Sequence, residues 1–189
     1  MRKKNRGFTL IEALVVVTII GILAALTVPA FTKMLERNRL KGAAEAVFSD
    51  LQLARTEAIK RNQDVKVSFS AAGPTTTWCY GTRVGGDCTC TVTDVTDATA
   101  CQVDNVLKVT RNADYADVAL AVGFNGAGAD RLTTGFNSRQ GTAETGSGTL
   151  ENGTVTLTLK ADELRVIVST VGRVRICTAT GMPGYEPCP

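Results

Sequence analysis

The amino-terminal segment, residues 1–31, constrains the fold of this chain most. Residues 1–6 include four basic residues, and the stretch between Arg6 and Lys33 contains a single formal charge, on Glu12. As a helix this stretch would measure about 39 Å at ~1.5 Å per residue, which exceeds the ~30 Å hydrocarbon layer of a membrane. We therefore predict a transmembrane helix over residues 8–31, with the basic start of the chain in the cytoplasm and the remainder across the membrane. A cleaved secretory signal is disfavoured, because no small-residue cleavage site follows a short apolar core.

The single acid in this apolar run indicates a functional role for Glu12. A carboxylate within a membrane costs about 2.5–3.5 kcal/mol on insertion scales, so it needs a cationic partner. No lysine or arginine of the same segment can supply one. The available cation is a free α-amino group made by cutting the chain before Phe8, on a neighbouring subunit, and this predicts a role for Glu12 in assembly with other subunits.

The residues around this acid resemble a known processing site. Arg6-Gly7-Phe8-Thr9-Leu10-Ile11-Glu12 is similar to the site found in type IV pilins and type II secretion pseudopilins. The resemblance implies that a prepilin peptidase cuts after Gly7, releases a leader of residues 1–7 and N-methylates Phe8. It also implies a single-pass protein of the bacterial inner membrane, with its globular domain in the periplasm, that joins other pilin or pseudopilin subunits and becomes extracellular in a pilus.

Beyond the apolar run, the spacing of hydrophobic residues changes twice. Over residues 32–63 they recur every three or four positions, which predicts an amphipathic helix with one buried stripe: Leu40, Ala44, Val47, Leu51, Ala54 and Ala58. After residue 64 the period becomes two, which is typical of β-strands, at Val65–Phe69, Thr154–Leu159 and Leu164–Val168. Further β-rich runs lie at 76–82, 103–110 and 118–124, and 141–153 reads as a loop. The prediction is an α+β, type IV pilin-like fold, in which a long helix packs on an antiparallel β domain of residues 64–189 with roughly seven to nine strands.

Composition excludes several kinds of catalytic site. Histidine is absent, so serine–histidine and cysteine–histidine nucleophile pairs and histidine-ligated metals are impossible. The formal charge of +3 falls to −1 without Arg2, Lys3, Lys4 and Arg6, so bulk charge gives no reason to expect nucleic-acid binding. We predict no enzymatic activity, no cofactor and no metal.

Six cysteines, an even number, favour disulfides, since a domain delivered across a membrane meets an oxidising compartment. Several connectivities remain open after a strained Cys88–Cys90 bond is excluded. The favoured arrangement joins Cys177 to Cys188 and pairs the other four, Cys79, Cys88, Cys90 and Cys101, among themselves. The alternative, a metal held by those four, lacks the two-residue spacer that is usual in zinc sites.

Gly172-Arg173-Val174-Arg175 is the most informative local feature of the β domain. On a strand, Arg173 and Arg175 would share one face, roughly 6.6 Å apart at ~3.3 Å per residue. Phosphates advance about 3.4 Å each along one DNA strand, so the pair could reach next-but-one phosphates. Arg165, in the preceding strand, would join them if the two strands form a hairpin. The alternative is that these arginines are only solvated or protect a sheet edge from aggregation.

Three segments carry a closer resemblance: residues 50–61, Gly135–Gly141 and Gly172–Cys177. Together they resemble the GspH/FimT branch of minor pseudopilins and minor type IV pilins. The Gly-Arg-x-Arg pattern is similar to that of FimT-like minor pilins, and this implies a protein that binds extracellular DNA and takes part in its uptake during natural transformation (competence). The alternative is a structural minor pseudopilin of a type II secretion system, or a pilus-assembly primer, without DNA binding.

Overall fold

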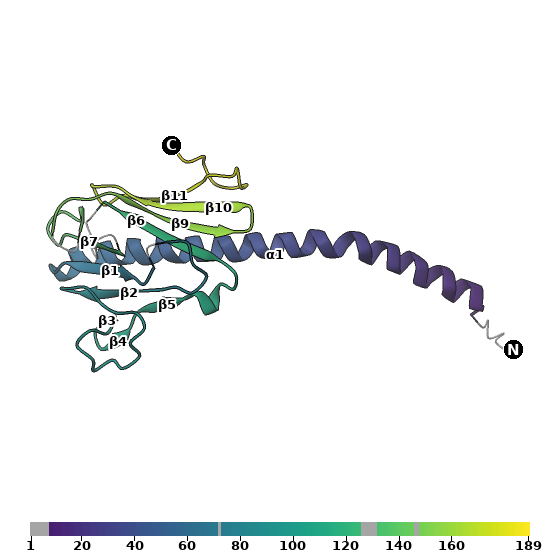
Figure 1. The fold of residues 1–189 in the computed structure, drawn as a ribbon, viewed down its shortest axis with the longest axis horizontal. Helices are drawn as coiled ribbons and strands as arrows, with labels where there is room; N and C mark the ends of the chain where they lie inside the picture. The colour runs from purple at the N-terminus through teal and green to yellow at the C-terminus, as the bar shows by residue number, and fades with distance from the viewer. Residues whose placement is uncertain (1–7, 72, 126–131, 146–147) are drawn as a thin grey trace, which may run out of the picture. The chain divides into compact units, whose positions relative to one another are not determined.

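A computed structural model describes residues 8–71, 73–125, 132–145 and 148–189 of the chain. The chain divides into two compact units, Met1–Arg37 and Asn38–Pro189, and each is described by itself. Helix α1 (Leu10–Arg61) supplies the described helical part of the first unit and the first element of the second (Figure 1).

In the first unit, Thr9 caps the start of α1. Its side-chain oxygen accepts the backbone N–H of Glu12 at 3.3 Å, and its carbonyl accepts that of Ala13 at 3.2 Å. Threonine followed three residues later by glutamate is the sequence of a capping box, which satisfies N–H groups that a helix leaves without partners at its start.

Two predictions for the first unit are not tested by the structure. The leader of residues 1–7, with the expected cleavage position Gly7, lies outside the described residues. Among the residues that the structure describes, none of the helices is both long enough and apolar enough to cross a membrane. The transmembrane segment over residues 8–31 stays a prediction.

The second unit is built around the remainder of α1. The stripe predicted from the sequence is buried there, with every side chain at most 1% exposed: Leu40, Ala44, Val47, Leu51, Ala54 and Ala58. These side chains share one hydrophobic core with strands of two antiparallel sheets, and the helix passes between the sheets (Figure 1). The helix ends at Arg61, and the next residue, Asn62, takes a left-handed backbone conformation (φ 52°) that is common at helix ends.

The two sheets differ in strand order. The first has the order β5-β2-β1-β7-β8, and the second β11-β10-β9-β6. The strands of the first are β1 (Val65–Phe69), β2 (Cys79–Val84), β5 (Val109–Arg111), β7 (Thr133–Phe136) and β8 (Ala143–Glu144). Those of the second are β6 (Ala119–Phe124), β9 (Gly153–Leu159), β10 (Asp162–Val168) and β11 (Val174–Thr178). A short hairpin of β3 (Gln102–Val103) and β4 (Val106–Leu107) and the 3-10 turn η1 (Asn112–Asp114) complete the unit.

The α+β fold predicted from the sequence is confirmed, with differences in detail. The run 103–110 is divided among β3, β4 and β5, because Asp104 and Asn105 both have positive φ and turn the chain back on itself. Residues 141–153 are not entirely loop, since β8 pairs with the end of β7. The described residues therefore contain eleven strands, several of them very short, where seven to nine were expected.

Candidate functional site

The candidate site lies on the hairpin of β10 and β11, which forms one edge of the second sheet. Arg165 lies opposite Cys177, and Ile167 opposite Arg175. Residues directly opposite in an antiparallel pair share a face, and successive residues alternate between faces. Since the alternate residues Val166 and Val174 are buried in the core, Arg165 and Arg175 both lie on the outer face of the sheet.

Arg173 is placed differently from the prediction. It precedes β11 and belongs to the turn that joins the two strands, rather than to the strand itself. Ser169 shapes this turn: its backbone N–H donates to the carbonyl of Arg173 at 3.0 Å, and its side-chain oxygen accepts the N–H of Arg173 at 3.1 Å. Gly172 completes the turn in a left-handed conformation (φ +74°), which a residue with a side chain rarely adopts.

The three arginines differ in their electrostatic surroundings. The Nε atom of Arg165 lies 2.6 Å from a carboxylate oxygen of Glu163, two positions earlier on the same strand face. Arg173 and Arg175 are exposed, and within the described part of the chain no ion pair joins either guanidinium to a carboxylate. The structure therefore brings Arg165 and Arg175 to one face and Arg173 next to it, but the charge of Arg165 is largely offset.

Sequence reasoning missed the residue that holds this turn. Arg55 of α1 donates from Nε to the carbonyl of Gly141 at 3.0 Å and from a terminal nitrogen to that of Val171 at 3.4 Å. A Cβ atom on Gly172 would lie 1.9 Å from the Gly141 carbonyl oxygen, so the two glycines pack backbone against backbone. These contacts join three sequence segments that the family resemblance singled out, but the acceptors are backbone carbonyls, so no side-chain pattern signals the contacts.

The C-terminal tail is held against α1. Tyr185 donates its hydroxyl to Glu45 at 2.9 Å, and Lys41 lies over its ring, 5.6 Å from the centroid. Partial burial, with the hydrogen bond to Glu45, raises the pKa of Tyr185 to about 12. The last aromatic ring of the chain is thus engaged with the helix rather than presented beside the arginines.

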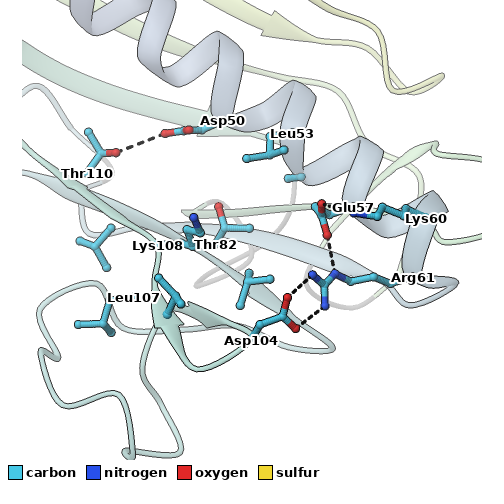
Figure 2. A pocket seen from close by; sticks show the side chains of 14 residues that line it. Asp50, Leu53, Glu57, Lys60, Arg61, Thr82, Asp104, Leu107, Lys108 and Thr110 are labelled. Carbon is cyan, nitrogen blue, oxygen red and sulfur yellow. Dashed lines mark hydrogen bonds and ion pairs between the residues drawn. The ribbon is translucent and has the colours of Figure 1, made fainter.

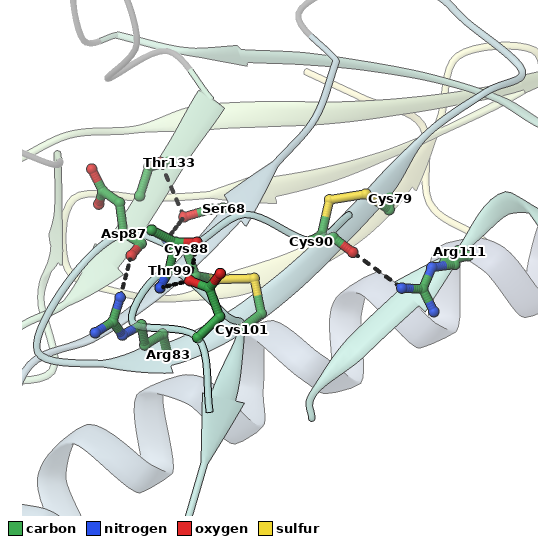
Figure 3. The surroundings of a disulfide bond; sticks show 11 residues. Ser68, Cys79, Arg83, Asp87, Cys88, Cys90, Thr99, Cys101, Arg111 and Thr133 are labelled. Carbon is green, nitrogen blue, oxygen red and sulfur yellow. Dashed lines mark hydrogen bonds between the residues drawn. A yellow bond between two sulfur atoms is a disulfide. The ribbon is translucent and has the colours of Figure 1, made fainter. Parts of the chain in front are cut away.

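All six cysteines form disulfides: Cys79–Cys90, Cys88–Cys101 and Cys177–Cys188. This is the arrangement that the sequence favoured. In the segment 79–101 the four sulfur atoms bond in pairs rather than surrounding a metal, and the described residues contain no other cluster of potential metal ligands. Figure 3 shows how Ser68 supports this segment, accepting the backbone N–H of Cys88 at 3.1 Å and the hydroxyl of Thr133 at 3.3 Å.

A cavity of about 530 Å³ lies between α1 and the β3–β5 segment (Figure 2). Its charged wall is a network in which Arg61 binds Asp104 with two hydrogen bonds of 2.5 and 2.6 Å and also binds Glu57. The hydrogen bonds from Arg61 lower the pKa of both carboxyls. Carboxylates held ionised by a cation are poor general acids, so this network stabilises the fold and offers no acid–base pair.

The residues of the predicted processing and assembly site lie at the start of the described chain. Phe8 is 76% exposed, and Glu12 lies in the first turn of α1. A carboxylate in the first turn also interacts favourably with the helix dipole. Stabilisation of the helix start is therefore a second, local reason for an acid at position 12. The contact between Glu12 and a neighbouring subunit stays a prediction, as does N-methylation of Phe8.

The sequence matches two known families, one over the globular unit and one at the start of the chain. The family described as type II transport protein GspH matches residues 43–172, and the prokaryotic N-terminal methylation motif matches residues 2–28. The type IV major fimbrial protein FimA of Dichelobacter nodosus is 31% identical over 111 residues, which cover 55% of this chain and 68% of that protein. The type IV major pilin PilA of Myxococcus xanthus is 58% identical over 36 residues, 19% of this chain and 16% of that protein.

Among solved structures, the type IV minor pilin FimU of Pseudomonas aeruginosa is similar, with a TM-score of 0.48 and 17% identity. The match covers 79% of this chain and 96% of that one. The families matched consist of structural pilins and pseudopilins rather than enzymes. With the GspH family covering most of the chain and the methylation motif at its start, this protein belongs to the GspH family and is a pilin-like protein of the type IV pilin and pseudopilin class.

Proposed function

We propose that this protein is a minor type IV pilin that binds extracellular DNA through Arg173 and Arg175 and contributes to DNA uptake in natural transformation. One observation supports this more than any other: these two arginines, two positions apart in the sequence, are both exposed, and no described carboxylate offsets their charge. Arg165 lies on the same sheet face but is paired with Glu163, so it is a secondary contributor that would have to leave its partner to bind a phosphate.

The proposed binding is electrostatic and insensitive to base sequence. Two guanidiniums contact two phosphates, and neutralising each phosphate of duplex DNA changes log K by about −0.9 per unit of log salt concentration. Base stacking is not part of the proposal, because Tyr185 is held against α1 by Glu45 and Lys41. With so few contacts a single subunit binds weakly, and several copies in one filament compensate through multivalency.

The membrane position follows from the family. Membership of the pilin and pseudopilin families indicates a membrane-anchored protein that assembles with other such subunits. We propose in addition that prepilin peptidase cleaves after Gly7 and methylates Phe8. The mature chain is then a single-pass protein of the bacterial inner membrane, with its globular unit in the periplasm until it enters a pilus.

DNA affinity measured over a range of salt concentrations tests the proposal. Full-length protein in a non-ionic detergent is titrated into fluorescently labelled duplex DNA, and anisotropy gives the dissociation constant. The variant Arg173→Gln/Arg175→Gln should bind more weakly at low salt, with a salt dependence about 2 units shallower. Binding equal to that of the wild type would refute the proposal.

A matched control removes the same charge elsewhere in the same unit. Lys108 is exposed, and among the described residues Arg83 donates to the carbonyl of Asp87 alone. The variant Arg83→Gln/Lys108→Gln therefore loses two charges away from the β10–β11 hairpin, and its DNA affinity and salt dependence should stay close to wild type. An equal loss in both double variants would indicate a response to net charge alone.

The GspH family match favours a second candidate, a structural minor pseudopilin of a type II secretion system or a pilus-assembly primer. In that function Arg173 and Arg175 are solvated residues at a sheet edge. A strain carrying Arg173→Gln/Arg175→Gln separates the two candidates: loss of transformation with normal filament assembly supports DNA binding, and normal transformation supports the structural function.

A further inference from the structure

We infer that Arg139 is a third phosphate-binding residue, on a loop that α1 holds against the β10–β11 turn, so that the DNA surface continues around the end of the sheet. This inference rests on the proposed function. It adds a cation that is distant from Arg173 in the sequence and is brought beside it only by the fold.

Arg139 shares the property that distinguishes Arg173 and Arg175. It is exposed, and no described side chain or carbonyl accepts a hydrogen bond from its guanidinium. The other described arginines of the second unit all have partners: Arg39 with Asp117, Arg55 with the carbonyls of Gly141 and Val171, Arg61 with Asp104 and Glu57, Arg83 with the carbonyl of Asp87, Arg111 with that of Cys90, and Arg165 with Glu163. The three arginines whose guanidinium has no described partner, Arg139, Arg173 and Arg175, all lie at or beside the β10–β11 turn.

The backbone that carries Arg139 is held in place by hydrogen bonds. The side-chain oxygen of Asn137 accepts the N–H of Arg139 at 2.9 Å, and its carbonyl accepts that of Gly141 at 2.8 Å. Next to it, the N–H of Ser138 donates to the Asp64 carboxylate at 2.8 Å. A loop fixed in this way presents its arginine with little loss of backbone entropy on binding.

Three contacts join this loop to the turn that carries Arg173. The N–H of Ala143 donates to the carbonyl of Thr170 at 3.1 Å, Gly141 and Gly172 pack against each other, and Arg55 binds carbonyls on both sides. Arg139 lies two positions before one of these glycines, and Arg173 follows the other.

These contacts limit the separation of the two cations. Arg139 lies two Cα–Cα steps of about 3.8 Å from Gly141, and Arg173 lies one such step from Gly172. Because the backbones of Gly141 and Gly172 are in contact, the Cα atoms of Arg139 and Arg173 lie at most about 17 Å from each other. Because phosphates advance about 3.4 Å each along the axis of a duplex and also turn around it, a separation up to this limit is spanned by a few phosphates of one strand. Long arginine side chains at these two positions can therefore bind one DNA backbone segment together.

Acids beside the loop set the size of the effect. The carboxylate of Asp64 accepts the Ser138 N–H, and Glu144 of β8 lies beyond the loop. Both repel phosphate, so we expect one added contact rather than a strong independent site. Arg139→Gln should therefore make the slope of log K against log salt concentration shallower by about 1.

The test uses full-length protein in detergent and the same labelled duplex. Arg139→Gln is compared with Arg139→Lys, which keeps the charge, and with Lys108→Gln, which removes one charge from the β4–β5 segment. Arg139→Gln should lower affinity about three- to tenfold at low salt and reduce the salt dependence, whereas Arg139→Lys should retain most of the binding and Lys108→Gln should match wild type. Emission from the buried Trp78 shows that each variant is folded.

The failure of this inference is distinguishable from that of the proposed function. If Arg139→Gln binds like wild type while Arg173→Gln/Arg175→Gln loses affinity, DNA binding stands and the third contact is wrong. An equal loss in Arg139→Gln and Lys108→Gln also overturns it, because the effect is then one of net charge. If the Arg173 and Arg175 variant binds as wild type does, the proposed function itself fails.

Discussion

Replacing Gly172 with alanine tests how the β10–β11 turn is held. Gly172 has φ +74°, and an added Cβ would lie 1.9 Å from the carbonyl oxygen of Gly141 and 3.1 Å from Nε of Arg55. Real Cβ atoms do not come so close to a backbone oxygen. The turn and the loop therefore have to move apart, and the hydrogen bonds of Arg55 to both of them weaken.

The expected loss of stability has two parts. A left-handed backbone costs alanine about 1–2 kcal/mol relative to glycine. The second part is the displacement of packed backbone, about 1–3 kcal/mol, together with the partial loss of the two Arg55 hydrogen bonds, about 1 kcal/mol in all. Gly181 isolates the first part, since its φ is +77° but its Cβ would meet no atom within 4 Å. By the packing and hydrogen-bond contributions alone, Gly172→Ala should thus be about 2–4 kcal/mol less stable than Gly181→Ala.

Unfolding is followed by the emission of Trp78, the only tryptophan in the chain, which is 2% exposed in the core of the second unit. Full-length protein in detergent is suitable, because this signal reports the globular unit alone. The difference in stability corresponds to roughly 5–15 °C in the unfolding midpoint for a domain of this size. Equal midpoints for Gly172→Ala and Gly181→Ala would show that the packing of the two glycines does not hold the turn.

Two further predictions concern other parts of the chain. Burial, reinforced by the hydrogen bond to Asp50, raises the pKa of Tyr80 well above its ordinary value of 10.0. Above pH 10 the unfolded chain therefore loses a proton that the native state keeps, so the free energy of unfolding should fall as the pH rises. In Tyr80→Phe, the dependence of this free energy on pH, measured by urea titration, should be shallower by up to about 1.4 kcal/mol per pH unit. Glu12→Gln retains a capping-box residue but removes the charge; both Glu12→Gln and Glu12→Ala should stay in the membrane fraction yet enter filaments poorly. Normal incorporation of Glu12→Gln would show that the acid serves only the helix start.

The elements with regular periodicity were predictable. The stripe from Leu40 to Ala58 lies in the core, and β1 has the bounds that its alternation predicted. The division of residues 103–110 into three short strands was not predictable. It depends on positive φ at Asp104 and Asn105, and neither residue type requires that conformation. Likewise β8 is only two residues long and is defined by its pairing with the end of β7, which no local pattern encodes.

For the candidate site, alternation correctly placed Arg175 opposite the core, but it extended the strand one position too far and included Arg173. The pairing of Arg165 with Glu163 could have been predicted, since alternate residues share a strand face. Arg55 could not. Its partners are backbone carbonyls of Gly141 and Val171, which lie far from it along the chain and carry no side-chain signal.

The two disulfides within residues 79–101 have overlapping spans, since Cys88 lies inside the loop closed by Cys79 and Cys90, while Cys90 lies inside the loop closed by Cys88 and Cys101. Every peptide bond from Cys79 to Cys101 is therefore bypassed by at least one covalent cross-link. A protease that cleaves this segment once leaves an intact covalent connection between α1 and the β10–β11 hairpin, so a nicked subunit still transmits tension from one to the other.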